Sequence, residues 1–489
     1  MTTSRFSFRQ TLLVLSLLAT QIIFAQAPDR SKPPELGPPP ALKVPAIQHL
    51  KLSNGIPVTL IEKHQVPLVD LVLQIKAGTA MDPADKVGLA SLTLAMLDEG
   101  AGTRTALQIA DEIDFLGASL STGASFHTST VSLHAPLARM EGALIIMADV
   151  ALRPIFPNEE LERQRKQRLT SLAQAHDNPN TIASVLFNRI LFSEQHPYGQ
   201  RTGGVEKTLR AFTAQDLKNF HAAHFVANNA QLIVVGAVTA KAVLSKLEAA
   251  FGKWQTGKTS TPTWVEAKQV ADRQIYLVDK PDAAQSVIRL GRLGVPRMTP
   301  DYYAITVMNT ILGGSFTSRL NQNLREQHGY AYGAGSGFGF NQLPGAFTAA
   351  ASVQTDATDK ALVEFMKELN GIRGEITDEE MTRAKNYEAL SYPGNFQTSG
   401  QIAGELSELV TYGLPDTYFN SYVIDVLAVT KEQAQAAAKK YIESEKIAII
   451  VVGDRQKIEA GIRALNLGQV NLLTTEEVLG KVPVLEGAN

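Results

Sequence analysis

The feature that most constrains this chain is an internal repeat, in which a segment of the first half recurs in the second. Thr213 opens a polar segment that leads into an apolar stretch ending at Gly236, and Thr430 opens a similar segment ending at Gly453; 213 and 430, like 236 and 453, are 217 positions apart. A threonine with an acidic residue in the next turn is typical of a helix N-terminus, and a β-branched run stopped by glycine is typical of a strand. Because the spacing holds without a gap, the sequence predicts two copies of one unit of about 220 residues.

The repeat also divides the chain into domains. At the same spacing, Glu62-Lys63 in the first copy corresponds to Asp279-Lys280 in the second. Between the copies, Gly257 and Pro262 interrupt a polar stretch, as is typical of a linker. The predicted divisions are 1–27 as a signal peptide, 28–46 as a proline-rich spacer, 47–255 as the first domain, 256–273 as the linker, 274–465 as the second domain and 466–489 as a tail.

Each copy combines strands and helices in a mixed order. The runs 55–61 and 68–75 are apolar and rich in β-branched residues, and 119–134 alternates polar and apolar residues as a hairpin does. Helices are predicted over 88–97, 107–116, 137–152 and 158–174. Strands that follow strands and helices that follow helices favour an α+β fold over a doubly wound parallel sheet. The predicted fold class is two homologous α+β domains, each with a mostly antiparallel sheet covered by helices.

The first residues of the chain predict export. Arg5 and Arg9 precede an apolar run from Thr11 to Phe24, and Ala25-Gln26-Ala27 fits a small-x-small cleavage site, as in a secretory signal peptide. The apolar run is shorter than the ~20 residues that a spanning helix needs, although a permanent anchor is the alternative interpretation. We therefore expect a mature protein that begins at Pro28, is periplasmic or secreted, and has no stable membrane anchor.

The composition of the chain excludes several kinds of partner and of active-site chemistry. With 46 basic and 48 acidic side chains the formal net charge is -2, so no nucleic-acid partner is expected. The absence of cysteine excludes a thiolate nucleophile, a cysteine-ligated metal and a disulfide framework. Only His, Asp and Glu could hold a metal. His221 and His224 have a spacing that could bind one, but histidines near a helix end are more typically packing residues.

A set of short motifs resembles one enzyme family. The motifs are His196-Pro197-Tyr198-Gly199, Gly88-Leu89-Ala90, Asp177-Asn178-Pro179, Gly313-Gly314 and the segment from Leu324 to Tyr332. In their order and spacing they resemble the insulinase/pitrilysin family of zinc metallopeptidases, in its processing-peptidase-like branch of two-domain subunits, over residues 47–465. The resemblance implies a clamshell-like pair of homologous domains and extended peptides as substrates.

The catalytic zinc motif of that family is missing here. In His-x-x-Glu-His, two histidines one helical turn apart bind zinc and the glutamate is the general base, while a distal glutamate completes the site. Counted from the neighbouring motifs, the two histidine positions are Ser91 and Ala95, the base position is Leu94 and the distal position is Ser171. None of these residues is a competent replacement. The resemblance therefore implies no cofactor in this chain, with zinc expected in a partner subunit.

The second copy contains an arginine and a tyrosine that match a second catalytic feature of the family. The resemblance implies that an arginine and a tyrosine seven residues later bind the substrate backbone and stabilise the tetrahedral intermediate, and Arg325 and Tyr332 have that spacing. A guanidinium and a phenol can both donate hydrogen bonds to an oxyanion. Tyr330 is a rival at a shorter spacing, and a solvated helix-end arginine beside a strand tyrosine is the structural alternative. Gly313 and Gly314 are expected near the bound peptide, or else at a simple helix end.

Two functional hypotheses follow. In the first, this chain is one subunit of an exported heterodimeric metallopeptidase and supplies Arg325 and Tyr332 to a homologous partner with an intact zinc motif. In the second, it is a non-enzymatic peptide-binding or assembly protein, which the loss of the zinc motif supports and the retained pair opposes. A self-sufficient peptidase would need a zinc site that the sequence does not reveal.

Overall fold

The computed structural model describes residue 37 and residues 42–259 and 262–485. The predicted signal peptide, 1–27, lies outside the described residues, as does most of the predicted spacer, 28–46. Within the described ranges, the helices are either too short or too polar to cross a bilayer.

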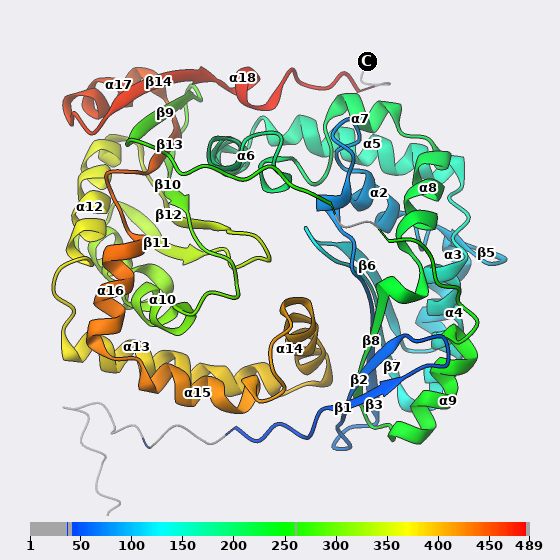
Figure 1. Cartoon of the computed structure of the whole chain (residues 1–489). Helices are drawn as coiled ribbons and strands as arrows, with labels where there is room; N and C mark the ends of the chain where they lie inside the picture. The colour runs from blue at the N-terminus through cyan, green and yellow to red at the C-terminus, as the bar shows by residue number, and fades with distance from the viewer. Residues whose placement is uncertain (1–36, 38–41, 260–261, 486–489) are drawn as a thin grey trace, which may run out of the picture. The chain divides into compact units, whose positions relative to one another are not determined.

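The first half forms a six-stranded sheet with helices packed on it (Figure 1). Its strand order is β1-β2-β8-β3-β7-β6; β2 and β8 are parallel and all other neighbours are antiparallel. The strands are β1 (Gln48–Lys51), β2 (Pro57–Glu62), β3 (Leu68–Ile75), β6 (Ser119–Ala124), β7 (Ser129–Pro136) and β8 (Ala230–Gly236), and β4 (Gly100–Ala101) and β5 (Arg104–Thr105) form a separate ribbon. The helices are α2 (Leu89–Ala95), α3 (Ala106–Phe115), α4 (Met140–Leu152), α5 (Asn158–Ala175), α6 (Pro179–Phe192), α7 (Glu206–Ala211), α8 (Ala214–His224) and α9 (Ala240–Phe251).

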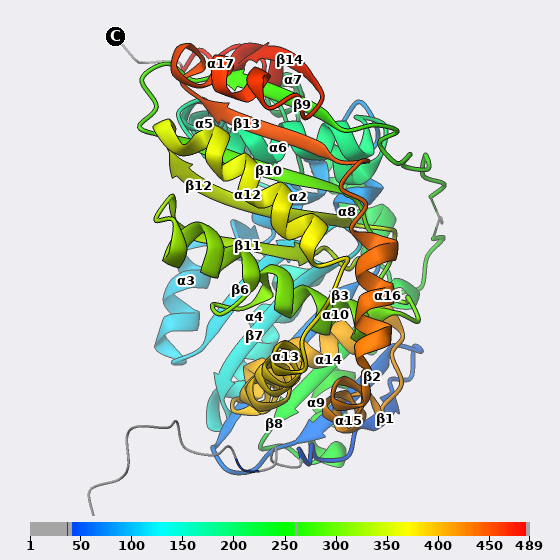
Figure 2. The same ribbon diagram turned by 90° about the vertical axis from the view of Figure 1, so that its left-hand side faces the viewer.

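The second half forms a sheet of the same kind, seen from another side in Figure 2. Its strands are β9 (Gln274–Asp279), β10 (Gln285–Leu293), β11 (Ala331–Phe338), β12 (Ala346–Gln354), β13 (Ala448–Gly453) and β14 (Gln469–Thr474). Its helices are α10 (Tyr302–Asn309), α11 (Arg319–Asn321), α12 (Thr358–Gly371), α13 (Asp378–Ser391), α14 (Ser399–Tyr412), α15 (Tyr418–Ala428), α16 (Lys431–Tyr441), α17 (Arg455–Ala464) and α18 (Thr475–Leu479), with π-helical turns η5 (Thr310–Gly314) and η6 (Gln322–Gln327). The predicted α+β class, with mostly antiparallel sheets, is confirmed in both halves.

The spacing of 217 residues recurs in the strands themselves. The first residues of β2 and β9 are 57 and 274, those of β3 and β10 are 68 and 285, and those of β7 and β12 are 129 and 346. The second sheet has the order β11-β12-β10-β13-β9-β14, which matches the first except at one edge. There, β1 joins its neighbour antiparallel from the N-terminal side, whereas β14 joins in parallel from residues 466–489, the predicted tail.

The N-termini of α8 and α16, which belong to the repeated segments, are capped by reciprocal hydrogen bonds. The Thr213 hydroxyl accepts from the backbone N–H of Asp216, and the Asp216 carboxylate accepts from the backbone N–H of Thr213. Thr430 and Gln433 form the same capping box in the second half. Each box satisfies donors that the first helical turn would otherwise leave unpaired, so the sequence fixes both helix starts locally.

Each sheet is covered on its second face by a helix from the other half. In β13 all six residues are buried: Ile449 and Val451 belong to the core of the second half, whereas Ala448, Ile450 and Val452 pack with α6 of the first half. A strand buried on both faces needs an unbroken apolar run, which is what this segment has. The junction between the halves on this side is thus mainly apolar, with Arg289 of β10 in contact with the Phe187 ring of α6.

In the same way, a helix of the second half, α14, covers the sheet of the first half. Ile61, Ile233 and Val235 of the first sheet pack into the core of the second half, next to α14, and Gln74 Nε2 donates to Thr411 Oγ1 of α14 at 2.7 Å. Figure 1 shows α6 beside the second sheet and α14 beside the first. Since α6 and α14 are equivalent elements of the repeat, the two halves hold each other in the same way.

We expect Phe187→Ala to lower the free energy of unfolding by about 3–5 kcal/mol, because a large buried ring in the shared layer would be replaced by a cavity. Phe187 of α6 is 1% exposed and lies so close to β10 that a Cβ on Gly291 would come within 2.6 Å of its ring. Urea unfolding measures this change.

Phe115→Ala is the matched control, because Phe115 also lies on a helix of the first half but is 82% exposed. This variant should stay within about 0.5 kcal/mol of the parent chain. Equal small losses in both variants would contradict the account of α6 as the element that joins the halves.

Candidate functional site

Helix α2, which carries the positions of the lost zinc motif, is anchored by its N-terminal loop. The backbone N–H groups of Gly88 and Ala90 donate to the Asp82 carboxylate at 2.7 and 2.8 Å, and burial raises the pKa of Asp82 to about 7. Gly88 has a φ of 95°, and a Cβ there would lie 2.5 Å from the Cα of Gly204. Glycine is required at position 88 by both its conformation and this close approach, which explains the glycine of the Gly88-Leu89-Ala90 motif.

The four positions of the zinc site hold side chains that do not fit the metal. Leu94 is 1% exposed and packs in the core, Ala95 has no donor atom, and the Ser171 hydroxyl donates back to the carbonyl of Gln167 in its own helix at 3.0 Å. The described residues contain no group of three His, Asp or Glu side chains that could hold a metal ion.

A cation from the chain itself contacts the first of these positions. Arg168 of α5 donates from Nη1 to Ser91 Oγ at 3.1 Å and to the Gly203 carbonyl at 3.3 Å, and from Nη2 to the Ser91 carbonyl at 3.0 Å. Burial lowers the pKa of Arg168, and its Nε is buried without a hydrogen-bond partner within the described part of the chain. Sequence reasoning missed Arg168, because nothing in the local pattern of α5 distinguishes it from the arginines at 163 and 165.

The structure brings Arg325 and Tyr332 together at the surface of the second half. The guanidinium carbon of Arg325 lies 5.2 Å from the ring centroid of Tyr332 and 4.5 Å from that of Phe316. Tyr332 is 90% exposed and Phe316 60%. Two aromatic rings thus hold one guanidinium by cation–π contacts, while the phenol and part of the guanidinium face solvent. Phe316 is the residue that the motif analysis missed, although it lies only two positions after the Gly313-Gly314 pair.

Gly313 and Gly314 lie in the π-helical turn η5, which packs on strand β11. A Cβ on Gly313 would collide with the backbone of Ser336, and a Cβ on Gly335 would lie 3.0 Å from the Gly313 carbonyl. Another backbone segment thus approaches this glycine-rich strand closely, which side chains at these positions would prevent. The contact also gives Gly313 a packing role in positioning the strand that carries Tyr332, while its expected contact with substrate stays a prediction.

The histidines at positions 221 and 224 pack as structural side chains. His221 Nε2 donates to the Ala151 carbonyl at 2.8 Å, and its ring stacks on Phe225. His224 packs against Phe220. Burial lowers the pKa of both histidines, so both favour the neutral form in the folded chain.

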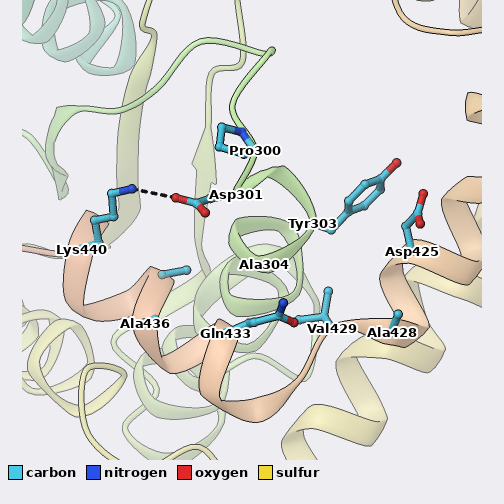
Figure 3. A pocket seen from close by; sticks show the side chains of 11 residues that line it. Pro300, Asp301, Tyr303, Ala304, Asp425, Ala428, Val429, Gln433, Ala436 and Lys440 are labelled. Carbon is cyan, nitrogen blue, oxygen red and sulfur yellow. Dashed lines mark hydrogen bonds and ion pairs between the residues drawn. The ribbon is translucent and has the colours of Figure 1, made fainter.

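A separate hollow of about 440 Å³ lies between α10, α15 and α16 (Figure 3). Among its charged groups, Asp301 pairs with Lys440 at 2.8 Å and also accepts from the Tyr441 hydroxyl, and Asp425 lines the hollow as well. Neither Arg325 nor Tyr332 lines it. We therefore place the candidate site at the Arg325–Tyr332 pair and not in this hollow.

Sequence comparisons assign the chain to a family. The model of the insulinase family, peptidase family M16, matches residues 57–203, and that of the peptidase M16 inactive domain matches residues 211–388. An uncharacterized zinc protease of Rickettsia felis is 30% identical over 337 residues, which are 68% of this chain and 80% of that protein. The chain belongs to the insulinase family, as a member without the family's zinc-binding motif.

One further relative and one solved structure are similar to this chain over most of its length. The non-peptidase homolog YmxG of Helicobacter pylori is 23% identical over 424 residues, covering 85% of this chain and 96% of that protein. The crystal structure of a peptidase M16 inactive domain from Pseudomonas fluorescens matches with a TM-score of 0.77 and 28% identity, covering 83% of this chain and 98% of that one. The insulinase-like fold predicted from the motifs is confirmed.

We expect the purified chain alone to retain no stoichiometric zinc and to cleave no peptide. The reason is that Ser91, Leu94, Ala95 and Ser171 replace every ligand and the general base, and a guanidinium contacts the first position. Metal analysis after dialysis against zinc-containing buffer, followed by a peptide-cleavage assay, measures both properties. About one tightly held zinc per chain would contradict this expectation.

Proposed function

We propose that this chain is the zinc-free subunit of an exported heterodimeric metallopeptidase, in which a homologous partner carries the intact zinc motif. The observation that carries the proposal is a surface pair of hydrogen-bond donors, Arg325 and Tyr332, kept in a chain that lacks a zinc site of its own. The Tyr332 ring contacts Arg325, but the side chain is 90% exposed and its phenol is available to a group brought by another molecule.

The geometry suits oxyanion binding. Phe316 and Tyr332 contact the Arg325 guanidinium, and its Nε pairs with Glu326 Oε1 at 3.4 Å, so the Nη groups are the donors available to a carbonyl or oxyanion. In the proposed complex the partner supplies the hydrolytic site, and this chain supplies donors for the peptide backbone and for the charge that develops on the scissile carbonyl oxygen. Gly313 acts through strand β11, since its close packing fixes where Tyr332 lies.

The signal-peptide pattern of residues 1–27 supports an exported site of action. Cleavage after Ala27 would release a periplasmic or secreted protein. An oligopeptidase or endopeptidase for extended peptides in that compartment is the role we assign to the complex.

The second candidate is a non-enzymatic peptide-binding or assembly protein. It is favoured by the loss of the whole zinc motif and by the Helicobacter pylori relative, which is called a non-peptidase homolog and aligns over 96% of its length. A non-enzymatic role, however, does not explain why an arginine and an exposed tyrosine occur at the family's spacing.

The test is a complex reconstituted with an exported homologue that has an intact His-x-x-Glu-His motif. Removal of one oxyanion donor typically lowers kcat by about 10²–10³. We expect Tyr332→Phe to cause a loss of that order, because only the hydroxyl is removed, and Arg325→Lys to be impaired because lysine lacks the planar fork. Steady-state cleavage of a fluorogenic peptide measures the effect.

Tyr387→Phe and Arg383→Lys are matched controls, since both side chains lie exposed on α13 and outside the candidate site; they should leave kcat/KM unchanged. Complex formation is measured in parallel by size-exclusion chromatography. Parental kcat/KM in both site variants would favour the non-enzymatic role, and failure of the variants to assemble would make the pair a structural element of the interface.

A further inference from the structure

The degenerate zinc site contains a half-buried positive charge that the family motif does not account for. Arg168 reaches from α5 to Ser91 of α2, the first histidine position, with hydrogen bonds to both its hydroxyl and its carbonyl. The third bond goes to the carbonyl of Gly203, in the segment before α7. One guanidinium therefore joins three parts of the chain that are far apart in sequence.

All three acceptors are neutral oxygens. Neither the hydrogen bonds nor the ion pairs of the described residues give Arg168 a carboxylate partner, in contrast to Arg163 on the same helix, which pairs with Glu99 and Glu160. A partly desolvated charge without a counterion costs folding free energy, so its retention needs a structural gain. The gain available here is the cross-link between α2, α5 and the Gly203 segment.

A zinc ion in a metallopeptidase makes a comparable cross-link, because its ligands come from the motif helix and from the distal helix. In this chain those helices are α2, with Ser91 and Ala95, and α5, with Ser171. Arg168 lies one turn before Ser171 in α5 and contacts the first ligand position directly. Its charge would also repel a divalent cation placed among these positions, since Coulomb repulsion in a partly desolvated site is strong.

We propose that the Arg168 guanidinium has taken over the structural role of the metal in this chain and excludes zinc from the degenerate site. The inference is independent of the proposed heterodimer, because it concerns the isolated chain. It makes two separable statements: the planar fork of Arg168 stabilises the fold, and its positive charge prevents metal binding.

Whether the charge of Arg168 excludes zinc is tested by restoring the three zinc ligands. Ser91→His, Ala95→His and Ser171→Glu are combined in the full mature chain, once with Arg168 retained and once with Arg168→Met, which has a similar reach without the charge. We expect the variant with Arg168→Met to bind zinc at least about 100-fold more tightly, measured by titration against a zinc-binding dye. Equal zinc affinity in the two variants would overturn charge exclusion, and no binding in either would overturn the comparison with a metal site, because the three positions would not converge on one metal.

Whether the Arg168 guanidinium stabilises the fold is tested with single substitutions in the otherwise unchanged chain. Arg168→Lys keeps the charge but loses the fork, so we expect a lower melting temperature and still no zinc binding. Arg163→Met on the same helix is the control, because its ion pairs lie near the surface and should matter little. An unchanged melting temperature for both Arg168→Lys and Arg168→Met would overturn the cross-link, and a loss as large in Arg163→Met would show that it is not specific to position 168.

Discussion

The exchange of helices α6 and α14 is the constraint on which the rest of the structure depends. Strands β8 and β13 are buried on both faces, and each lacks a cover from its own half on one of them. Burial of large apolar side chains contributes about 1.5–3 kcal/mol each, so an uncovered face would be costly to either half. Each half of the repeat therefore stabilises its sheet with a helix of the other half, and neither is complete as a folding unit.

Contacts that do not depend on a metal explain how the zinc motif can be lost while the fold is kept. The motif helix α2 is held by the Asp82 carboxylate at its start, by the Gly88–Gly204 contact and by apolar side chains such as Leu94. None of these contacts involves a metal ligand. The hydrogen bonds from Arg168 to Ser91 join α2 to α5 without a metal.

The sequence predicts the fold well wherever the signal is local. Strand β3 was expected at 68–75 and has those bounds, and the capping threonines at 213 and 430 mark helix starts that the structure confirms. The edge strand β14 was missed, because its only reason to be a strand is a parallel pairing with β9, almost two hundred positions earlier in the chain. Such long-range pairing leaves no pattern in the segment itself.

The same distinction holds for the site. The spacing of Arg325 and Tyr332 could be read from the chain, and the loss of the zinc ligands could be read by position. Phe316 and Arg168 could not, since each acquires its role from a side chain or backbone group that only the tertiary structure brings near. An arginine in a polar helix looks like a solvated charge until its partners are known.

The proposed function requires Tyr332 of this chain to lie close to the metal of a partner subunit when a peptide is cleaved. The most direct measurement is the fluorine NMR line of 3-fluorotyrosine placed at position 332, in a complex whose partner carries either zinc or paramagnetic cobalt. The account predicts a line that is sharp with zinc and strongly broadened with cobalt. A line that is equally sharp with both metals, in a complex shown to be assembled, would contradict it.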